Sequence, residues 1–211
     1  MDHTGTAVRA EHRKTCSANA RSLCRALRRL AQAILAAIAA LTLVCASLAQ
    51  TLATGEYDVK AAFLFHFAQF VEWPGETFKD ANSPLTYCTI GDDPFHGALD
   101  TILSGKTLGT RPFHVLHFKQ SQEIQGCQVL FIGAGERKLL PELLAKAKTN
   151  SVLTVGESEH FAPEGGMIGF VLEGNKIRFE INLEAAQKAR LKISSRLLAL
   201  AKNVIGGQRG K

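Results

Sequence analysis

The chain has 211 residues, with 25 Lys and Arg against 19 Asp and Glu, which gives a formal net charge of +6. Residues 1–49 hold seven Lys and Arg and two Asp and Glu, so the rest of the chain carries a charge of only +1. The basic balance therefore gives no indication of nucleic-acid binding. The ~160 residues that follow position 49 suffice for one domain with a hydrophobic core.

The first element is a leader. Four arginines between positions 21 and 29 precede a short apolar run, Leu30–Val44, and small residues follow up to Ala49. This order is typical of a secretory signal peptide, and the run is shorter than the ~20 residues of a membrane span. We expect cleavage near Ala49. An uncleaved anchor and lipidation at Cys45 are the alternatives.

A helix and a strand are predicted next. Apolar residues recur at three- and four-residue steps over Glu56–Trp73, which predicts a helix that Pro74 ends. Leu85–Ile90 is a β-rich run. Asp93 then predicts a helix N-cap, with Pro94 at the first helical position and the helix running to about Leu103.

The middle of the chain alternates strand and helix, which predicts parallel pairing in an α/β fold. The expected elements are strands at Arg111–Phe118, Cys127–Ile132 and Val152–Val155, and a helix at Glu136–Lys148.

The last third of the chain breaks this alternation. Glu173-Gly174-Asn175 predicts a hairpin between strands Met167–Leu172 and Lys176–Ile181. The second strand alternates, with Ile177, Phe179 and Ile181 toward the core and Lys176, Arg178 and Glu180 toward solvent. A helical segment at Leu183–Ala189 follows, and a last helix begins at Ser194 or Ser195 with an apolar stripe of Leu197, Leu198, Ala201 and Val204.

The predicted fold is therefore a single α/β domain. Its mixed sheet is mostly parallel, ends in a C-terminal antiparallel hairpin and is flanked by helices. We expect residues 1–49 to be the signal peptide, 55–205 the folded domain and 206–211 a flexible tail.

Two cysteines, Cys88 and Cys127, follow the leader. In an exported protein such a pair favours one disulfide, which would stabilise the fold by roughly 3–4 kcal/mol. Two reduced thiols in neighbouring strands are the alternative. Neither cysteine has a His or Cys at metal-ligand spacing, and we expect no metal and no cofactor.

Catalytic motifs are weak throughout. Ser104–Thr107 resembles the end of a phosphate-binding loop, but Asp100 stands where the motif needs glycine. His114 and His117 would point to opposite faces of a strand. Ser194-Ser195 lacks the context of a nucleophile and is explained by helix capping. We therefore expect a binding protein and not an enzyme.

Three acidic residues remain as binding candidates. Asp92 and Asp93 follow a strand directly, where α/β sheets tend to bind ligands, and Arg111 could lie near the same cleft. Glu180 lies on the polar side of a half-buried strand. It is either a solvated or salt-bridged residue, with Arg178 or Lys192 as partner, or a recognition contact.

Four segments, residues 56–74, 85–99, 126–132 and 178–201, resemble the YfiR family of exported bacterial proteins in sequence, order and spacing. The resemblance implies a periplasmic, non-enzymatic protein that dimerises. It implies binding to the periplasmic part of an inner-membrane diguanylate cyclase, which is held inactive, so that cyclic-di-GMP and biofilm formation fall. An outer-membrane lipoprotein that sequesters the repressor is a further implied partner.

The resemblance also assigns residues. Cys88 and Cys127 match one cysteine pair of the family, whereas a second pair would fall near Ala162 and Gly169 and is absent. Glu180 and Lys192 are implied partner contacts. Ser194, with Lys192, lies where small-ligand binding is implied.

The leading hypothesis is a periplasmic repressor of a membrane diguanylate cyclase. The alternative is a periplasmic small-molecule-binding module that feeds a sensor histidine kinase, with Asp92 and Asp93 at its ligand site.

Overall fold

A mixed eight-stranded sheet organises the residues that this computed structural model describes, which are 55–119, 126–174 and 176–207. They belong to one compact unit, and the predicted leader lies outside the described residues. The strand order is β10-β8-β7-β6-β5-β2-β4-β3. The eight strands are β2 (Leu85–Ile90), β3 (Thr107–Leu108), β4 (Arg111–Phe118), β5 (Val129–Ile132), β6 (Leu153–Gly156), β7 (Ile168–Glu173), β8 (Lys176–Asn182) and β10 (Asn203–Ile205).

The pairing confirms the predicted fold class. Strands β4, β2, β5, β6 and β7 run parallel to one another, and β7 and β8 form the antiparallel hairpin. Gly174 in the hairpin turn has φ +59°, a left-handed conformation that glycine adopts without a steric penalty. Beyond the hairpin, β10 returns parallel to β8, and β3 pairs antiparallel with β4 at the other edge.

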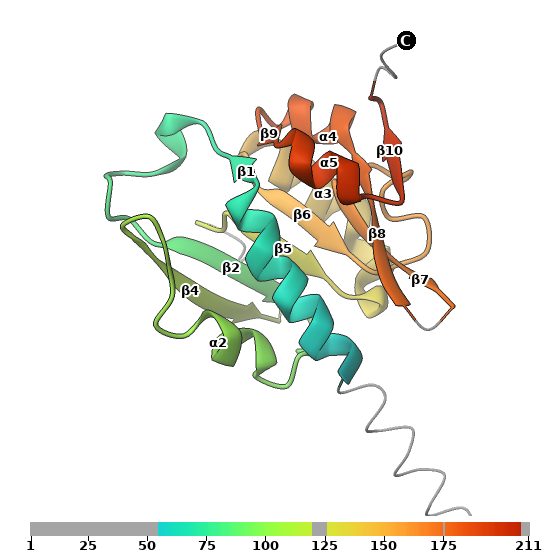
Figure 1. Cartoon of the computed structure of the whole chain (residues 1–211), viewed down its shortest axis with the longest axis horizontal. Coiled ribbons are helices and arrows are strands. Elements are labelled where there is room, and N and C mark those ends of the chain that lie inside the picture. The colour runs from blue at the N-terminus through green and yellow to red at the C-terminus, as the bar shows by residue number, and fades with distance from the viewer. Residues whose placement is uncertain (1–54, 120–125, 175, 208–211) are drawn as a thin grey trace, which may run out of the picture. The chain divides into compact units, whose positions relative to one another are not determined.

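Helices cover both faces of the sheet (Figure 1). The N-terminal helix, residues 55–69, crosses the face formed by side chains such as Tyr87 and Phe131, which we call the N-helix face. The opposite face, where Cys88 and Ile132 pack against α3 (Leu140–Thr149), is the α3 face. The other helices are α2 (Ala98–Leu103), α4 (Leu183–Lys188) and α5 (Ser195–Leu200), with short 3-10 turns at Gly75–Thr77 and Ala134–Leu139.

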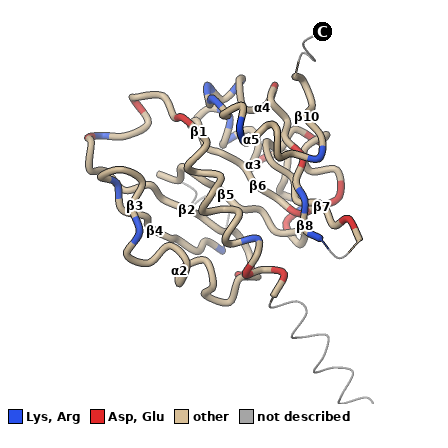
Figure 2. The backbone as a smooth tube through the Cα atoms, viewed as in Figure 1, with Lys and Arg blue, Asp and Glu red and all other residues tan. Residues whose placement is uncertain are grey.

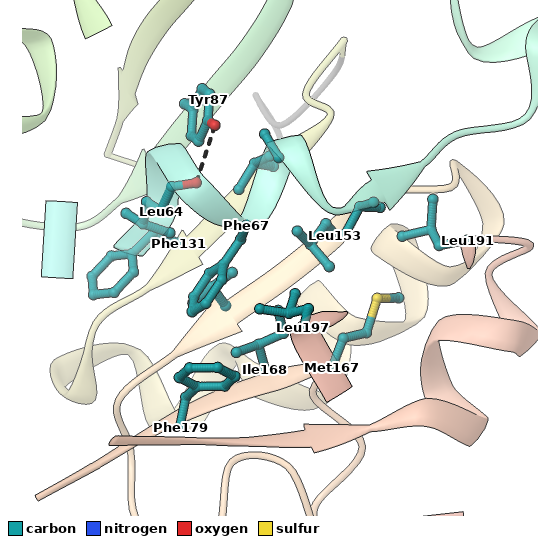
Figure 3. Packing of buried hydrophobic residues seen from close by; sticks show 14 of the residues in the cluster. Leu64, Phe67, Tyr87, Phe131, Leu153, Met167, Ile168, Phe179, Leu191 and Leu197 are labelled. Atoms are coloured by element: carbon teal, nitrogen blue, oxygen red, sulfur yellow. Dashed lines mark hydrogen bonds between the residues drawn. The ribbon is translucent and has the colours of Figure 1, made fainter. Parts of the chain in front are cut away.

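The main core lies on the N-helix face. Phe67 of the N-terminal helix packs edge-on against Phe179 of β8, with ring centroids 5.0 Å apart. Figure 3 shows Phe67, Phe179, Ile168 and Leu197 gathered in this cluster. The same view shows the hydroxyl of Tyr87 donating a hydrogen bond to the Leu64 carbonyl at 3.1 Å. Burial raises the pKa of that hydroxyl, so it stays protonated and remains a donor to the helix.

Predicted boundaries are wrong at four helix ends, where tertiary pairing or local turn geometry replaces the helical preference. The helix expected from Glu136 starts with a 3-10 turn, and α3 begins only at Leu140. The first helix ends at residue 69, since β1 (Val71–Glu72) pairs antiparallel with β9 (Lys192–Ile193) far along the chain. Helix α2 begins at Ala98 and not at Pro94, because His96 and Gly97 adopt positive φ. Val204 lies in β10 beside Ile181 and does not continue the stripe of α5.

The predicted cap of the last helix is confirmed, whereas Asp93 is not the N-cap of α2, which is Gly97. The Ser194 hydroxyl accepts a hydrogen bond from the Arg196 N–H at 3.2 Å, as expected for an N-cap. The Asp93 carboxylate accepts hydrogen bonds from the N–H groups of Phe95 and Gly97, so it caps the turn before α2.

The predicted disulfide is present. Cys88 in β2 and Cys127 before β5 are bonded and buried on the α3 face. The bond joins two neighbouring central strands. Beside it, the Gln128 side chain accepts a hydrogen bond from the Thr86 N–H at 2.8 Å, so the two strands are also tied through a buried polar contact.

Candidate recognition surface

Glu180 lies in β8 on the α3 face. It stands between Gly169 of β7 and Asn203 of β10, and its side chain is half-buried. Its neighbours Phe179 and Ile181 are buried on the opposite face. The predicted alternation of this strand is therefore confirmed. Within the described residues Glu180 has no ion pair, so the predicted pairing with Arg178 or Lys192 is wrong.

Two basic side chains share the α3 face of β8 with Glu180. Lys176 and Arg178 are both exposed, and neither has an ion-pair partner within the part of the chain that the structure describes. Helix α3 and Phe161 pack over the central strands, and at the end of β8 the Asn182 side chain donates to the Ala162 carbonyl, so the exposed part of β8 on this face is its beginning, at Lys176 and Arg178. Figure 2 shows the charged residues of β8 and of the hairpin at this edge of the molecule. We call Lys176, Arg178 and Glu180 the β8 charge row.

Lys192 and Ser194 belong to a different surface. Lys192 is exposed in β9, opposite Glu72, with 3.9 Å between its Nζ and the Glu72 carboxylate. Its neighbour Ile193 packs into the core of the N-helix face, and the Ser194 N–H donates to the Phe70 carbonyl. The side chain of Glu180 points to the α3 face. The structure therefore does not bring Glu180 together with Lys192 and Ser194.

The predicted cleft of Asp92, Asp93 and Arg111 is wrong. The two aspartates follow the carboxyl end of β2, whereas Arg111 begins the parallel strand β4, at the opposite end of the sheet. Arg111 donates hydrogen bonds to the carbonyls of Asp80 and Ser83 and stacks on Phe78, so it is a structural residue. The Asp93 carboxylate is occupied by backbone capping, and Asp92 is exposed.

A buried polar cluster was missed by the sequence reasoning. Lys60 of the N-terminal helix is 5% exposed, and its Nζ lies 2.5 Å from both the Glu157 and the Glu56 carboxylates. The Tyr57 hydroxyl donates to Glu157 at 3.0 Å, and the Ala134 N–H lies 3.3 Å from the same carboxylate. We call Glu56, Tyr57, Lys60 and Glu157 the Lys60 cluster.

The Lys60 cluster ties the helix to the sheet. Glu157 follows the carboxyl end of β6, so its carboxylate reaches the first turns of the N-terminal helix. Burial and the negative charge of Glu157 raise the pKa of Tyr57, which keeps the phenol protonated as a donor. Sequence could have indicated the cluster, because Lys60 lies four residues before Leu64 on the buried stripe of the helix and a charge there needs a partner.

Two surface depressions lie away from the predicted ligand residues. One of about 420 Å³ lies between α3 and α4, with Leu144, Lys148, Met167 and Lys188 in its lining. Another of about 510 Å³ lies beside Cys127 and Arg190. Asp92, Asp93 and Ser194 line neither. Among the described residues no group of three or more acidic, His or Cys side chains is placed to hold a metal ion. No helix in residues 55–119, 126–174 and 176–207 combines the length and apolarity of a membrane span.

The comparisons with known proteins identify the family. A model of the YfiR/HmsC-like family matches residues 57–202, more than half of the chain, and the chain belongs to this family. Among solved structures, the chain is similar to the ABC domain in complex with L-Trp from Streptococcus pneumonia. The TM-score is 0.42 and the identity 10%, over 57% of this chain and 55% of that one, so the match spans about half of that chain.

Family membership sets the class of protein. The YfiR-like family is periplasmic and generally regulatory rather than catalytic, and membership suggests a regulator of a diguanylate cyclase. The Cys88–Cys127 disulfide fits an oxidising compartment.

Proposed function

We propose that this chain is a periplasmic, non-enzymatic repressor that binds the periplasmic part of an inner-membrane diguanylate cyclase and stabilises its inactive state. Cyclic-di-GMP and biofilm formation would fall as a result. The observation that supports this proposal most strongly is the YfiR/HmsC-like match over residues 57–202. The exposed β8 charge row supports a binding role, since it is built into the sheet yet has no partner within the described residues.

Repression of this kind needs only differential binding. A repressor that binds the inactive state of a sensor tenfold more tightly than the active state shifts the equilibrium by ~1.4 kcal/mol. A few residues at the centre of an interface supply such a difference. Glu180 is our first candidate for such a contact. Lys192, on the other side of the sheet, would contact either a second part of the cyclase or a second partner, such as an outer-membrane lipoprotein or another copy of this chain.

The test is a deletion with complementation. We expect loss of the gene to raise cyclic-di-GMP and surface attachment, and the full chain to restore both. Residues 50–211 behind an unrelated cleavable secretory leader should restore them equally, because the proposed role of residues 1–49 is export alone. Unchanged cyclic-di-GMP in the deletion strain would overturn the cyclase version of the proposal.

A binding measurement completes the test. Residues 50–211, immobilised with the disulfide intact, should retain the purified periplasmic domain of an inner-membrane diguanylate cyclase from the same cell. The matched control is the periplasmic domain of a histidine kinase from the same cell, which separates the proposed partner class from the alternative sensor. Retention of the kinase domain alone would contradict the proposal.

A further inference from the structure

The outer edge of β8 is only partly covered. Strand β10 pairs with Glu180–Asn182 alone, whereas β7 pairs with β8 from Lys176 to Ile181. The only further bond on the outer side within the described residues is that from the Lys202 N–H to the Phe179 carbonyl, at 2.8 Å. The segment 176–179 therefore has a strand on one side and no described strand on the other (Figure 1).

The hydrogen-bond pattern shows which backbone groups face this open edge. Asn182 donates its N–H to Met167, at the inner side toward β7, while Phe179 accepts from Lys202 at the outer side. Successive residues of a strand point their backbone groups to opposite edges. The N–H and C=O of Ile177 and the N–H of Phe179 therefore point outward, where an added strand would pair with them.

The side chains beside the open edge differ between the two faces. On the N-helix face, Ile177 lies opposite Leu172, which is 66% exposed, and Phe63 packs against Phe179 with ring centroids 5.7 Å apart. Val59, one turn before Phe63, is also exposed. On the α3 face, Lys176 and Arg178 are exposed and unpaired among the described residues. The edge therefore presents apolar contacts on one face and two basic side chains on the other. The acidic groups nearest to them on that face are Glu173, which lies opposite Lys176 and pairs with Lys202, and Glu180, beside β10.

This charge argues against a second copy of the chain at the same edge. Two β8 edges paired about a twofold axis would place Lys176 and Arg178 close to their own counterparts, and like charges opposite each other destabilise a pair of strands. A partner strand of opposite charge meets no such penalty. The Lys202–Glu173 ion pair, 3.1 Å long and partly exposed, lies near the hairpin and is too weak to hold the edge closed.

We propose that the edge formed by residues 176–179 receives an extended acidic segment of the partner protein by strand addition. Its apolar side chains would contact Ile177 and its neighbours, and its alternating carboxylates would pair with Lys176 and Arg178. This inference rests on the proposed function, for which it specifies the partner's chemistry.

Capped peptides provide a direct test on residues 50–211. The probe is a fluorescent six-residue peptide of alternating valine and glutamate, and its matched counterpart replaces each glutamate with lysine. We expect saturable binding of the acidic peptide alone, weakened by salt because the charges are exposed. The hydrogen exchange of the Ile177 amide should slow on binding. Methylation of alternate peptide nitrogens, in the register that faces β8, should abolish peptide binding, because those nitrogens can no longer donate hydrogen bonds to the edge.

Charge variants make the test specific. In Lys176→Glu with Arg178→Glu, affinity for the acidic peptide should fall at least about tenfold, and the lysine peptide should bind instead. The control is Lys138→Glu with Lys148→Glu, which makes the same change of net charge at exposed positions elsewhere. Equal binding of the acidic peptide by the β8 variant, an equal loss in the control, or no binding of either peptide would overturn strand addition.

Complementation separates this inference from the proposed function. If deletion raises cyclic-di-GMP and the β8 variant still restores full repression, the repressor role stands and the acidic strand is wrong. If deletion leaves cyclic-di-GMP unchanged, the repressor role is wrong, and the peptide measurements still decide whether the edge binds acidic strands. We expect the β8 variant to fail in repression and the Lys138, Lys148 control to succeed.

Discussion

The Lys60 cluster and the β8 charge row use similar charged side chains in opposite ways. Where the N-terminal helix meets the sheet, Lys60 is buried and held by two carboxylates within hydrogen-bond distance. In β8, Lys176, Arg178 and Glu180 have no ion-pair partner among the described residues. A buried charge has to be paired, because its desolvation is otherwise too costly, whereas an exposed charge needs no partner to remain stable. The Lys60 cluster therefore maintains the fold, whereas the charges of the β8 charge row contribute little to it and are our proposed recognition contacts.

Loss of the Cys88–Cys127 disulfide should have the largest effect on stability, because this bond constrains the central strands and not β8. The disulfide joins β2 and β5 across a sequence separation of 39. Replacing Cys88 and Cys127 together by alanine should lower the free energy of unfolding by about 4 kcal/mol, because the unfolded chain gains entropy. Urea unfolding of residues 50–211 with and without reductant measures this. If the double variant and the wild type have equal midpoints in oxidising buffer, the bond does not stabilise the centre.

The Lys60 cluster gives the next effect in size. Glu157→Ala removes the buried partner of Lys60 and of Tyr57, and we expect a loss of about 3 kcal/mol in urea unfolding at neutral pH. The control is Glu184→Ala. Its carboxylate pairs with Lys188 in an exposed pair of the same charge type, so its loss should lower stability far less than that of Glu157. Similar losses in the two variants would show that burial of the pair is unimportant.

The sequence contained most of the fold because the main signals are local. The β-rich run Leu85–Ile90 forms a central strand that is buried throughout, and Gly174 lies in the hairpin turn. The alternation of Lys176–Ile181 predicts that Glu180 lies on the opposite face of the strand from Phe179 and Ile181, as the structure has it. These features depend on neighbouring residues and on the repeat of two along a strand.

The remainder depends on pairs that are distant in sequence. Lys60 and Glu157 are 97 residues apart, and no local pattern links them. The helix that was expected to reach Trp73 ends at residue 69 because β9 pairs with Val71 and Glu72. Arg111 was expected beside Asp92, but parallel strands place the start of β4 and the end of β2 at opposite ends of the sheet. Such placements follow from topology, which local propensity does not determine.

The smallest expected effect on stability is that of Glu180→Gln, which makes it the most selective probe of the outer strand. The side chain is half-buried and has no ion pair among the described residues, so the free energy of unfolding should change by no more than about 0.5 kcal/mol. If Glu180 contacts the cyclase, removal of its charge should still weaken retention of the periplasmic domain and raise cyclic-di-GMP in the complemented strain.

The control is Glu159→Gln, an exposed carboxylate in the loop after β6. A variant that unfolds normally and represses normally would move the contact to Lys192, on the other side of the sheet, because that residue is the remaining candidate from the family resemblance.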